Sequence, residues 1–154
     1  MRLNIGCGKK RKKGYVNLDI RPLPGVNIVA DVAHLPFKES SIEEIFAESV
    51  LEHCSRIKVV SILEDWIKIL EPKGSIHIIC PNLRLLAEKY LTGVLTTEKY
   101  VRQIYGDQGY LENTHYCGFD PCYLVGLLKK LGVQYVELID EQLNNNNLYI
   151  VGHK

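Results

Sequence analysis

Residues 3–20, LNIGCGKKRKKGYVNLDI, contain the pattern that decides the fold. The apolar run at 3–5 is followed by Gly6, Cys7 and Gly8, and a second run covers 15–20. Short apolar runs bounded by glycine are typical of buried strands. Glycine also lets the chain turn sharply and lets a ligand approach the backbone, because it has no Cβ atom. This stretch therefore predicts a strand, a glycine turn and a second strand.

The connection between these two predicted strands is short and basic. About eight residues separate them, whereas a crossover that contains a full helix needs roughly ten to twelve. We therefore expect the first helix of this α/β unit to be reduced or absent. In its place stands the basic loop, residues 9–13, which reads Lys-Lys-Arg-Lys-Lys. Such runs can bind phosphate groups, but most are solvated loops.

Further along the chain, apolar runs alternate with amphipathic stretches, a pattern that predicts a mostly parallel sheet covered by helices. One such stretch has Val60, Leu63 and Trp66 at helical spacing. The last two runs flank an asparagine-rich turn, so we expect them to pair antiparallel. The further predicted strands are 26–30, 42–48, 75–80, 134–139 and 147–152, and the predicted helices are 57–70, two within 83–105, and 120–131.

Composition indicates one domain that covers residues 1–154. The chain is 46% hydrophobic and 24% charged, which is ordinary for a globular protein. No apolar run reaches the ~18 residues of a membrane span, and the N-terminus lacks the pattern of a signal peptide, so we expect a cytoplasmic protein without membrane contact. The net charge of +1 provides no general attraction for nucleic acid, which we do not expect as a partner.

We expect the five cysteines to be reduced and mostly buried thiols. Their number is odd and no pair shows the two-residue spacing of a zinc knuckle, so the sequence suggests no disulfide framework. His115, Cys117 and Cys122 lie close together in sequence, but their spacing matches no zinc pattern. We therefore expect no metal.

Acidic and glycine residues end three neighbouring strands of the predicted sheet. A dinucleotide-binding loop would have a third glycine at position 11, where the chain has Arg11. Asp19 ends the second strand, where a carboxylate can accept hydrogen bonds from both hydroxyls of a ribose, and Asp31 ends the third strand at the same edge. This set suits a phosphate-free adenosine compound better than a dinucleotide. Both aspartates could instead be ordinary loop caps.

An ordered set of motifs links the chain to a known family. In this order they resemble the class I methyltransferases that use S-adenosylmethionine, in particular a short form of the type 11 group. The resemblance implies a Rossmann-like, three-layer α/β sandwich whose mostly parallel seven-stranded sheet ends in an antiparallel hairpin. The motifs are residues 3–8, 16–20, 30–37 (ADVAHLPF), 48–53 (ESVLEH), 70–74, 80–82 and 115–132.

The same resemblance implies S-adenosylmethionine as the cofactor and assigns positions to it. The glycine turn would face its methionine part, Asp19 the ribose, and Asp31 with Val32 the adenine, while residues 48–53 would lie beside the sulfonium. Because the first helix is missing, the methionine carboxylate could meet a lysine of the basic loop. The implied cofactor-binding residues are Gly6, Cys7, Gly8, Asp19, Ile20, Asp31, Val32 and Glu48.

Methyl transfer from a sulfonium requires positioning, exclusion of water and in some enzymes a base. The candidate catalytic bases are His53 and His115, with Glu52 and Tyr116 as partners, although His53 could equally cap the turn after the fourth strand. The polar, aromatic segment 105–116 stands where the resemblance places the acceptor pocket, unless it merely packs over the sheet. The candidate substrate-binding residues are Tyr105, Tyr110, Asn113 and Tyr116.

These observations predict an S-adenosylmethionine-dependent methyltransferase that acts on an oxygen or nitrogen of a small molecule or glycan-type acceptor. Residues 48–51 lack the motif with which DNA amino-methylating enzymes hold a flipped base, so DNA adenine is disfavoured. Because the chain is short, a homodimer could complete the pocket. The alternative is a non-catalytic domain of the same fold that binds S-adenosylmethionine or a partner. A nicotinamide or nucleotide-sugar enzyme is disfavoured by Arg11.

Overall fold

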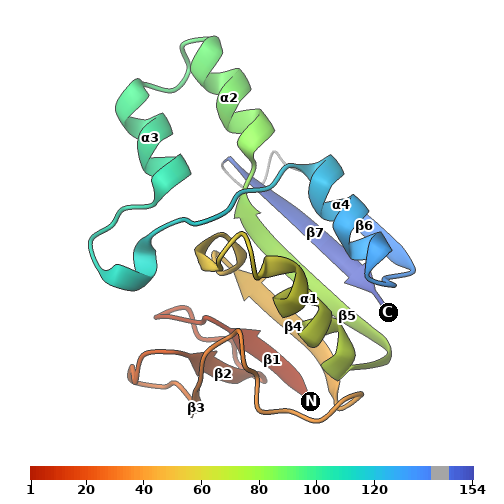
Figure 1. Ribbon diagram of the computed structural model, residues 1–154. Coiled ribbons are helices and arrows are strands. Elements are labelled where there is room, and N and C mark those ends of the chain that lie inside the picture. The colour runs from red at the N-terminus through yellow and green to blue at the C-terminus, as the bar shows by residue number, and fades with distance from the viewer. Residues whose placement is uncertain (140–145) are drawn as a thin grey trace.

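The computed structural model describes residues 1–139 and 146–154, which form an α/β fold around one seven-stranded sheet (Figure 1). The strand order is β3-β2-β1-β4-β5-β7-β6. Strands β1 to β5 pair in parallel, and β7 pairs antiparallel with both β5 and β6. This topology confirms the predicted Rossmann-like sheet with its terminal hairpin. The strands are β1 (Arg2–Ile5), β2 (Val16–Asp19), β3 (Ile28–Val29), β4 (Ile42–Glu48), β5 (Leu70–Pro81), β6 (Tyr135–Ile139) and β7 (Asn147–His153).

Each main helix lies inside a range predicted from the sequence, and three of the four begin at a side-chain cap. In α2, α3 and α4 the cap is Asn82, Thr96 or Asp120, which accepts a hydrogen bond from a backbone N–H of the first turn. The helices are α1 (Val59–Ile69), α2 (Leu83–Leu91), α3 (Thr97–Tyr105) and α4 (Pro121–Lys130), with short 3-10 helices η1 (Leu51–His53) and η2 (Leu111–Asn113).

Helices α1 and α4 lie over the same face of the sheet (Figure 1). Alternate strand residues such as Leu3, Ile45 and Ile76 point to this face, where they form one core with the buried residues of both helices. Trp66 is fully buried in this core. The predicted apolar stripe was wrong in one detail, because Val60 is 41% exposed.

The expected loss of the first helix is confirmed, and the basic loop covers the sheet in its place. Asn4, Asn17 and Phe46 are neighbours in register, so their side chains share one face. The Asn4 side chain donates to the carbonyl of Lys10 at 2.9 Å, and that of Asn17 accepts from the amide of Lys12 at 2.8 Å. The Lys12 ammonium lies 3.3 Å from the centroid of the Phe46 ring. The loop backbone is thus tethered to the sheet, while four of its five residues, Lys9, Lys10, Arg11 and Lys13, stay exposed to solvent.

Strand β5 begins earlier than predicted, because residues 71–74 form a bulge rather than only a turn. The β4 and β5 pairing shifts register between Ile42 and Glu44. A Cβ atom at Gly74 would stand 2.9 Å from the carbonyl oxygen of Glu71, so only glycine fits there. The asparagine-rich turn predicted between β6 and β7 lies largely outside the described residues.

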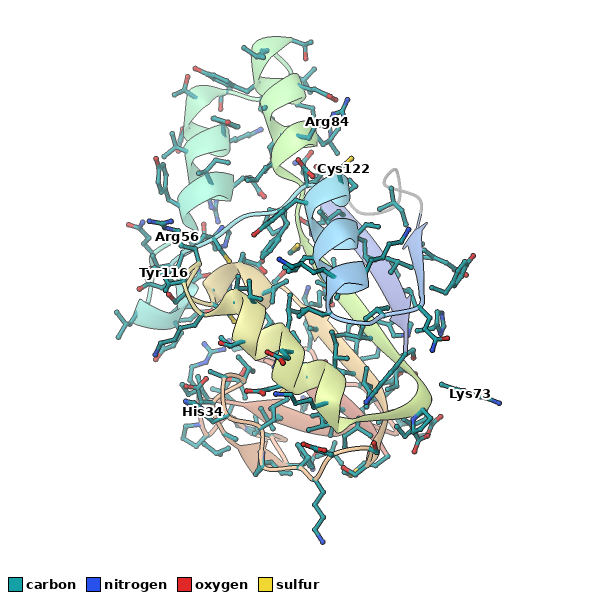
Figure 2. The ribbon with its side chains drawn as sticks, turned by 45° about the vertical axis from the view of Figure 1, so that its right-hand side comes forward. His34, Arg56, Lys73, Arg84, Tyr116 and Cys122 are labelled. Atoms are coloured by element: carbon teal, nitrogen blue, oxygen red, sulfur yellow. The ribbon has the colours of Figure 1, made fainter. Side chains whose placement is uncertain are left out.

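The described helices are all too short or too polar to cross a membrane. All five cysteines are free thiols, as predicted. Figure 2 shows the exposed one, Cys122, at the start of α4, whereas Cys7, Cys54 and Cys80 are buried.

Candidate active site

A cavity of about 1030 Å³ lies at the carboxyl edge of the parallel strands. We call it the larger cavity. It is walled by residues that follow β1, β2, β3 and β4 and by the first turns of α1. Ligand sites of open parallel sheets form at this edge. All eight predicted cofactor-binding residues line it: Gly6, Cys7, Gly8, Asp19, Ile20, Asp31, Val32 and Glu48.

The glycine turn is shaped by two residues in the left-handed region. Gly6 has φ +58° and Gly8 has φ +51°, conformations that cost other residues energy. The Cys7 amide donates to the carbonyl of Leu18 at 2.9 Å, and the Gly8 amide donates to Asp19 Oδ2 at 2.7 Å. These bonds tie the turn to the end of β2.

Asp19 is the centre of the hydrogen bonds at this edge, with only 2% of its surface exposed. Besides the Gly8 amide, it accepts from Arg21, whose backbone amide and Nε lie 2.9 and 3.1 Å from Oδ1. Burial alone would raise the pKa of Asp19, but the hydrogen bonds from Arg21 and Gly8 outweigh it and hold the pKa below its ordinary value. Asp19 therefore both lines the cavity and organises the turn.

The far wall of the larger cavity is apolar and anchored to the core. Trp66 donates its indole N–H to the carbonyl of Val32 at 2.7 Å, which fixes the loop after β3. Asp31 Oδ1 accepts a hydrogen bond from the Ala33 amide at 2.9 Å. One oxygen of this aspartate therefore acts as a loop cap, which was the alternative to a role in ligand binding. Ile20 lines the same cavity although 49% of its surface is exposed. A flat apolar ligand would cover it.

A smaller cavity of about 540 Å³ adjoins the larger one. Ser49 and His53 line both cavities, so they mark the junction. Helix α3 contributes the basic residues Lys99 and Arg102 to the lining of the smaller cavity. Arg102 forms an ion pair with Asp107, which also lines this space.

The Glu-His-His cluster, which comprises Glu52, His53 and His115, lies in the wall of the smaller cavity. The two imidazole rings meet edge to face with centroids 4.9 Å apart. Burial lowers the pKa of His53 and of His115, so both imidazoles favour the neutral form. Burial also raises the pKa of the Glu52 carboxyl to about 8. The structure thus brings the two predicted catalytic histidines together.

The predicted substrate-binding residues are divided between the two cavities. Tyr110 and Tyr116 line the larger cavity and Asn113 lines the smaller one, whereas Tyr105 is 56% exposed and lines neither. Figure 2 shows Tyr116 beyond the N-terminal end of α1. The Arg21 guanidinium lies 4.7 Å from the centroid of the Tyr110 ring. This contact joins the segment 105–116 to the end of β2.

Three site residues were missed by the sequence analysis. Arg21 partners Asp19, and Lys99 and Arg102 line the smaller cavity from a helix that is remote in sequence. The only available signal for Arg21 was its position two residues after a strand-ending aspartate. For Lys99 and Arg102 the sequence held no signal, because the placement of α3 over the sheet edge is a tertiary result.

Comparison with known proteins agrees with this geometry. The family described as a methyltransferase domain of type 11 matches residues 8–78, just under half of the chain. This match covers the glycine turn at Gly8, Asp19, Asp31 and the motif 48–53. No curated protein shows significant sequence similarity.

Several solved structures share the fold over 99% of this chain. An S-adenosylmethionine-dependent methyltransferase of Archaeoglobus fulgidus has a TM-score of 0.69 at 16% identity, with 85% of that chain covered. One from Thermotoga maritima has a TM-score of 0.68 at 13% identity, with 81% covered. The 1,6-didemethyltoxoflavin-N1-methyltransferase of Burkholderia thailandensis, solved with its acceptor and S-adenosylhomocysteine, has a TM-score of 0.62 at 14% identity and 70% coverage. Identities this low show the fold, which here is that of methyltransferases.

Proposed function

We propose that this chain, which has the class I methyltransferase fold and matches the type 11 methyltransferase domain over residues 8–78, is an S-adenosylmethionine-dependent methyltransferase. The observation that carries the proposal is the larger cavity at the carboxyl edge of the sheet, which is lined by all eight residues expected to bind the cofactor. The fold alone would not suffice, because one fold hosts many functions.

The residues of the larger cavity fit the parts of S-adenosylmethionine. The Asp19 carboxylate already accepts three hydrogen bonds, which leaves roughly one of its four lone-pair positions for a ribose hydroxyl. The exposed Ile20 and the loop at Val32 provide an apolar wall for a purine ring. Lys10, which pairs with Glu48, lines the same cavity and offers a cation for an amino-acid carboxylate. Nothing in this lining demands a phosphate group.

When bound, S-adenosylmethionine supplies a methyl group on a positively charged sulfur. The chain contributes the positioning of the acceptor and the exclusion of water. Ser49 and His53 stand at the junction of the two cavities, where a donor in one would meet an acceptor in the other. His53 and His115 are the residues we assign to activation of the acceptor.

The acceptor that suits the smaller cavity is a polar small molecule or a glycan-type compound with a reacting oxygen or nitrogen. The volume of about 540 Å³ is in the range of small-molecule sites. Lys99, Arg102 and Asn113 offer hydrogen-bond donors to an acceptor that carries oxygen atoms or negative charge.

Calorimetric titration tests the cofactor assignment. We expect S-adenosylmethionine and its demethylated product to bind with micromolar affinity and NAD not to bind. Lys10→Ala should weaken both sulfur compounds but not free adenosine, since adenosine lacks the carboxylate that the lysine would meet. Binding of both compounds without turnover of any candidate acceptor would favour a non-catalytic domain, and no binding at all would refute the proposal.

We also propose that a second copy of the chain completes the site. The hairpin of α2 and α3 projects beyond the sheet (Figure 1), and α3 has no buried residue. Leu91 and Val94 at its tip are 82% and 68% exposed. Exposed apolar clusters of this kind mark interaction surfaces. The same hairpin carries Lys99 into the smaller cavity, so a copy docked on it would also cover the acceptor.

Light scattering at micromolar chain concentration should therefore report a dimer. Leu91→Glu should convert it to a monomer without changing the helical circular dichroism, because the substitution adds a charge only to the exposed tip. A monomeric parent chain would contradict the proposal.

A further inference from the structure

Glu52 is a buried carboxyl group with an unfilled hydrogen-bonding position. Its side chain belongs to a residue that is 2% exposed, and Oε2 has no hydrogen-bond partner among the described residues. A buried polar atom without a partner costs about 1–3 kcal/mol, and more if it carries charge. The backbone of Glu52 is fixed, because its carbonyl accepts from the Tyr116 amide at 2.8 Å. With the main chain at Glu52 fixed, a ligand that binds Oε2 would remove this cost.

Two histidines beside this carboxyl are oriented in the manner of metal ligands. Nδ1 of His53 lies 3.0 Å from the carbonyl oxygen of Thr114, and Nδ1 of His115 lies 3.0 Å from that of Gln103. A carbonyl oxygen can only accept, so each Nδ1 carries the proton and donates. Each Nε2 is then the ring nitrogen with the free lone pair. Backbone carbonyls fix metal-binding histidines in this way in known sites.

We propose that Glu52, His53 and His115 bind one divalent transition-metal ion in the wall of the smaller cavity. The three side chains offer ligand atoms that all lie within 4.8 Å of one another. Bonds of about 2.1 Å at tetrahedral angles would place such atoms roughly 3.4 Å apart, so the side chains need to close by no more than about 1.4 Å.

The donor set selects the class of metal. Two imidazole nitrogens and one carboxylate suit Zn²⁺, Co²⁺ or Fe²⁺, whereas Mg²⁺ prefers a set made only of oxygen. Three protein ligands also leave at least one position open, as in catalytic rather than structural sites. His115 and Glu52 line the smaller cavity, so the open position would face the space that we assign to the acceptor. This set combines residues that are about sixty positions apart, which is why the cysteine and histidine spacing in the sequence did not reveal it.

The consequence for catalysis rests on the proposed methyltransferase function. A hydroxyl or amine coordinated at the open position would lose its proton to solvent more readily, because the metal stabilises the deprotonated form. His53 and His115 would then act as ligands, and the metal would take the place of a general base. Metal binding itself does not depend on that function.

Titration of the metal-free chain, residues 1–154, with Co²⁺ tests the site without any cofactor or acceptor. We expect one equivalent to produce visible absorption bands, and Zn²⁺ to displace it. Glu52→Gln and His115→Ala should each weaken Co²⁺ binding at least ~10-fold, as loss of a ligand does when even outer partners are worth ~10–100-fold. His153→Ala is the matched control and should bind as the parent chain does, since its ring packs on Tyr135 at the other end of the sheet.

Three results would overturn the proposal: no stoichiometric Co²⁺ binding, binding that both variants retain in full, or preference for Mg²⁺ over Zn²⁺. Thermal unfolding of each variant shows whether a loss of binding is merely a loss of fold. S-adenosylmethionine titration after treatment with a chelator separates the two assignments. Cofactor binding without metal binding refutes only the metal site, and metal binding without cofactor binding refutes only the proposed function.

Discussion

Asp19→Ala is expected to reduce S-adenosylmethionine binding below detection in a calorimetric titration that records micromolar binding by the parent chain. The substitution removes the ribose partner and also releases the amide of Gly8 and the guanidinium of Arg21. Hydrogen bonds to a charged group are worth about 1.5–3 kcal/mol each, so loss of these two should lower the free energy of unfolding by roughly 3–6 kcal/mol. Urea unfolding measures that loss independently of the ligand.

Asp65→Ala is the matched control for this prediction. Asp65 also lines the larger cavity, but its side chain is 61% exposed and, among the described residues, its one ion pair is with Lys68 on the same helix. Removal of such a surface pair changes stability by at most about 1 kcal/mol. Equal binding by Asp19→Ala and Asp65→Ala would show that Asp19 has no part in the site.

The pH dependence of Asp19 follows from its hydrogen bonds. Its pKa in the folded chain lies below the value of about 3.9 that an unfolded aspartate has. The stability that the ionised group contributes is therefore fully present above that value and is lost as the pH falls through the folded pKa. The difference in unfolding free energy between the parent chain and Asp19→Asn should be constant near neutral pH and should shrink below about pH 4. A difference that stays constant into strong acid would mean that the carboxylate is not preferentially stabilised.

Much of the fold could be predicted because local signals and global topology agree. The glycine turn follows from sequence alone, as does a second strand, which was predicted at 15–20 and lies at 16–19. The short loop between the first two strands left no room for a helix. Asp120 and Pro121 identify the start of α4, because a cap and a proline at the first helical position satisfy local backbone geometry. Such features depend on residues that are close in sequence, so they can be predicted from the sequence alone.

Features that depend on tertiary contacts could not be predicted. Val60 and Val59 are both apolar, and only the docking angle of α1 decides that Val59 is buried. The bulge before Ser75 arises from pairing with β4. In the candidate site, Asp19 and the two histidines could be named from the sequence. The missing hydrogen-bond partner of Glu52 Oε2 could not, because the number of partners of a buried atom depends on how the chain packs around it.

Gly6→Ala is expected to cause a large loss of stability and with it the loss of the cofactor turn. A Cβ atom there would stand 2.5 Å from Val50 Cγ2 and 3.2 Å from Cγ1, and Gly6 has φ +58°. Val50 is 5% exposed and β-branched, so it cannot rotate away at low cost. Left-handed strain of about 1–2 kcal/mol and overpacking of about 1–3 kcal/mol together predict a decrease of roughly 2–5 kcal/mol in the free energy of unfolding.

Substitution of Gly8 distinguishes the cost of left-handed backbone strain from the cost of overpacking against Val50. At Gly8, φ is +51° but an added Cβ would approach nothing closer than the Arg21 guanidinium at 3.5 Å, an ordinary contact. Gly8→Ala should therefore cost only the strain of about 1–2 kcal/mol. In a Val50→Ala background the cost of Gly6→Ala should fall to the same value, since the clashing methyl groups are gone. Equal costs for Gly6→Ala in both backgrounds would exclude overpacking against Val50 and leave backbone strain as the sole reason for glycine at the head of the turn.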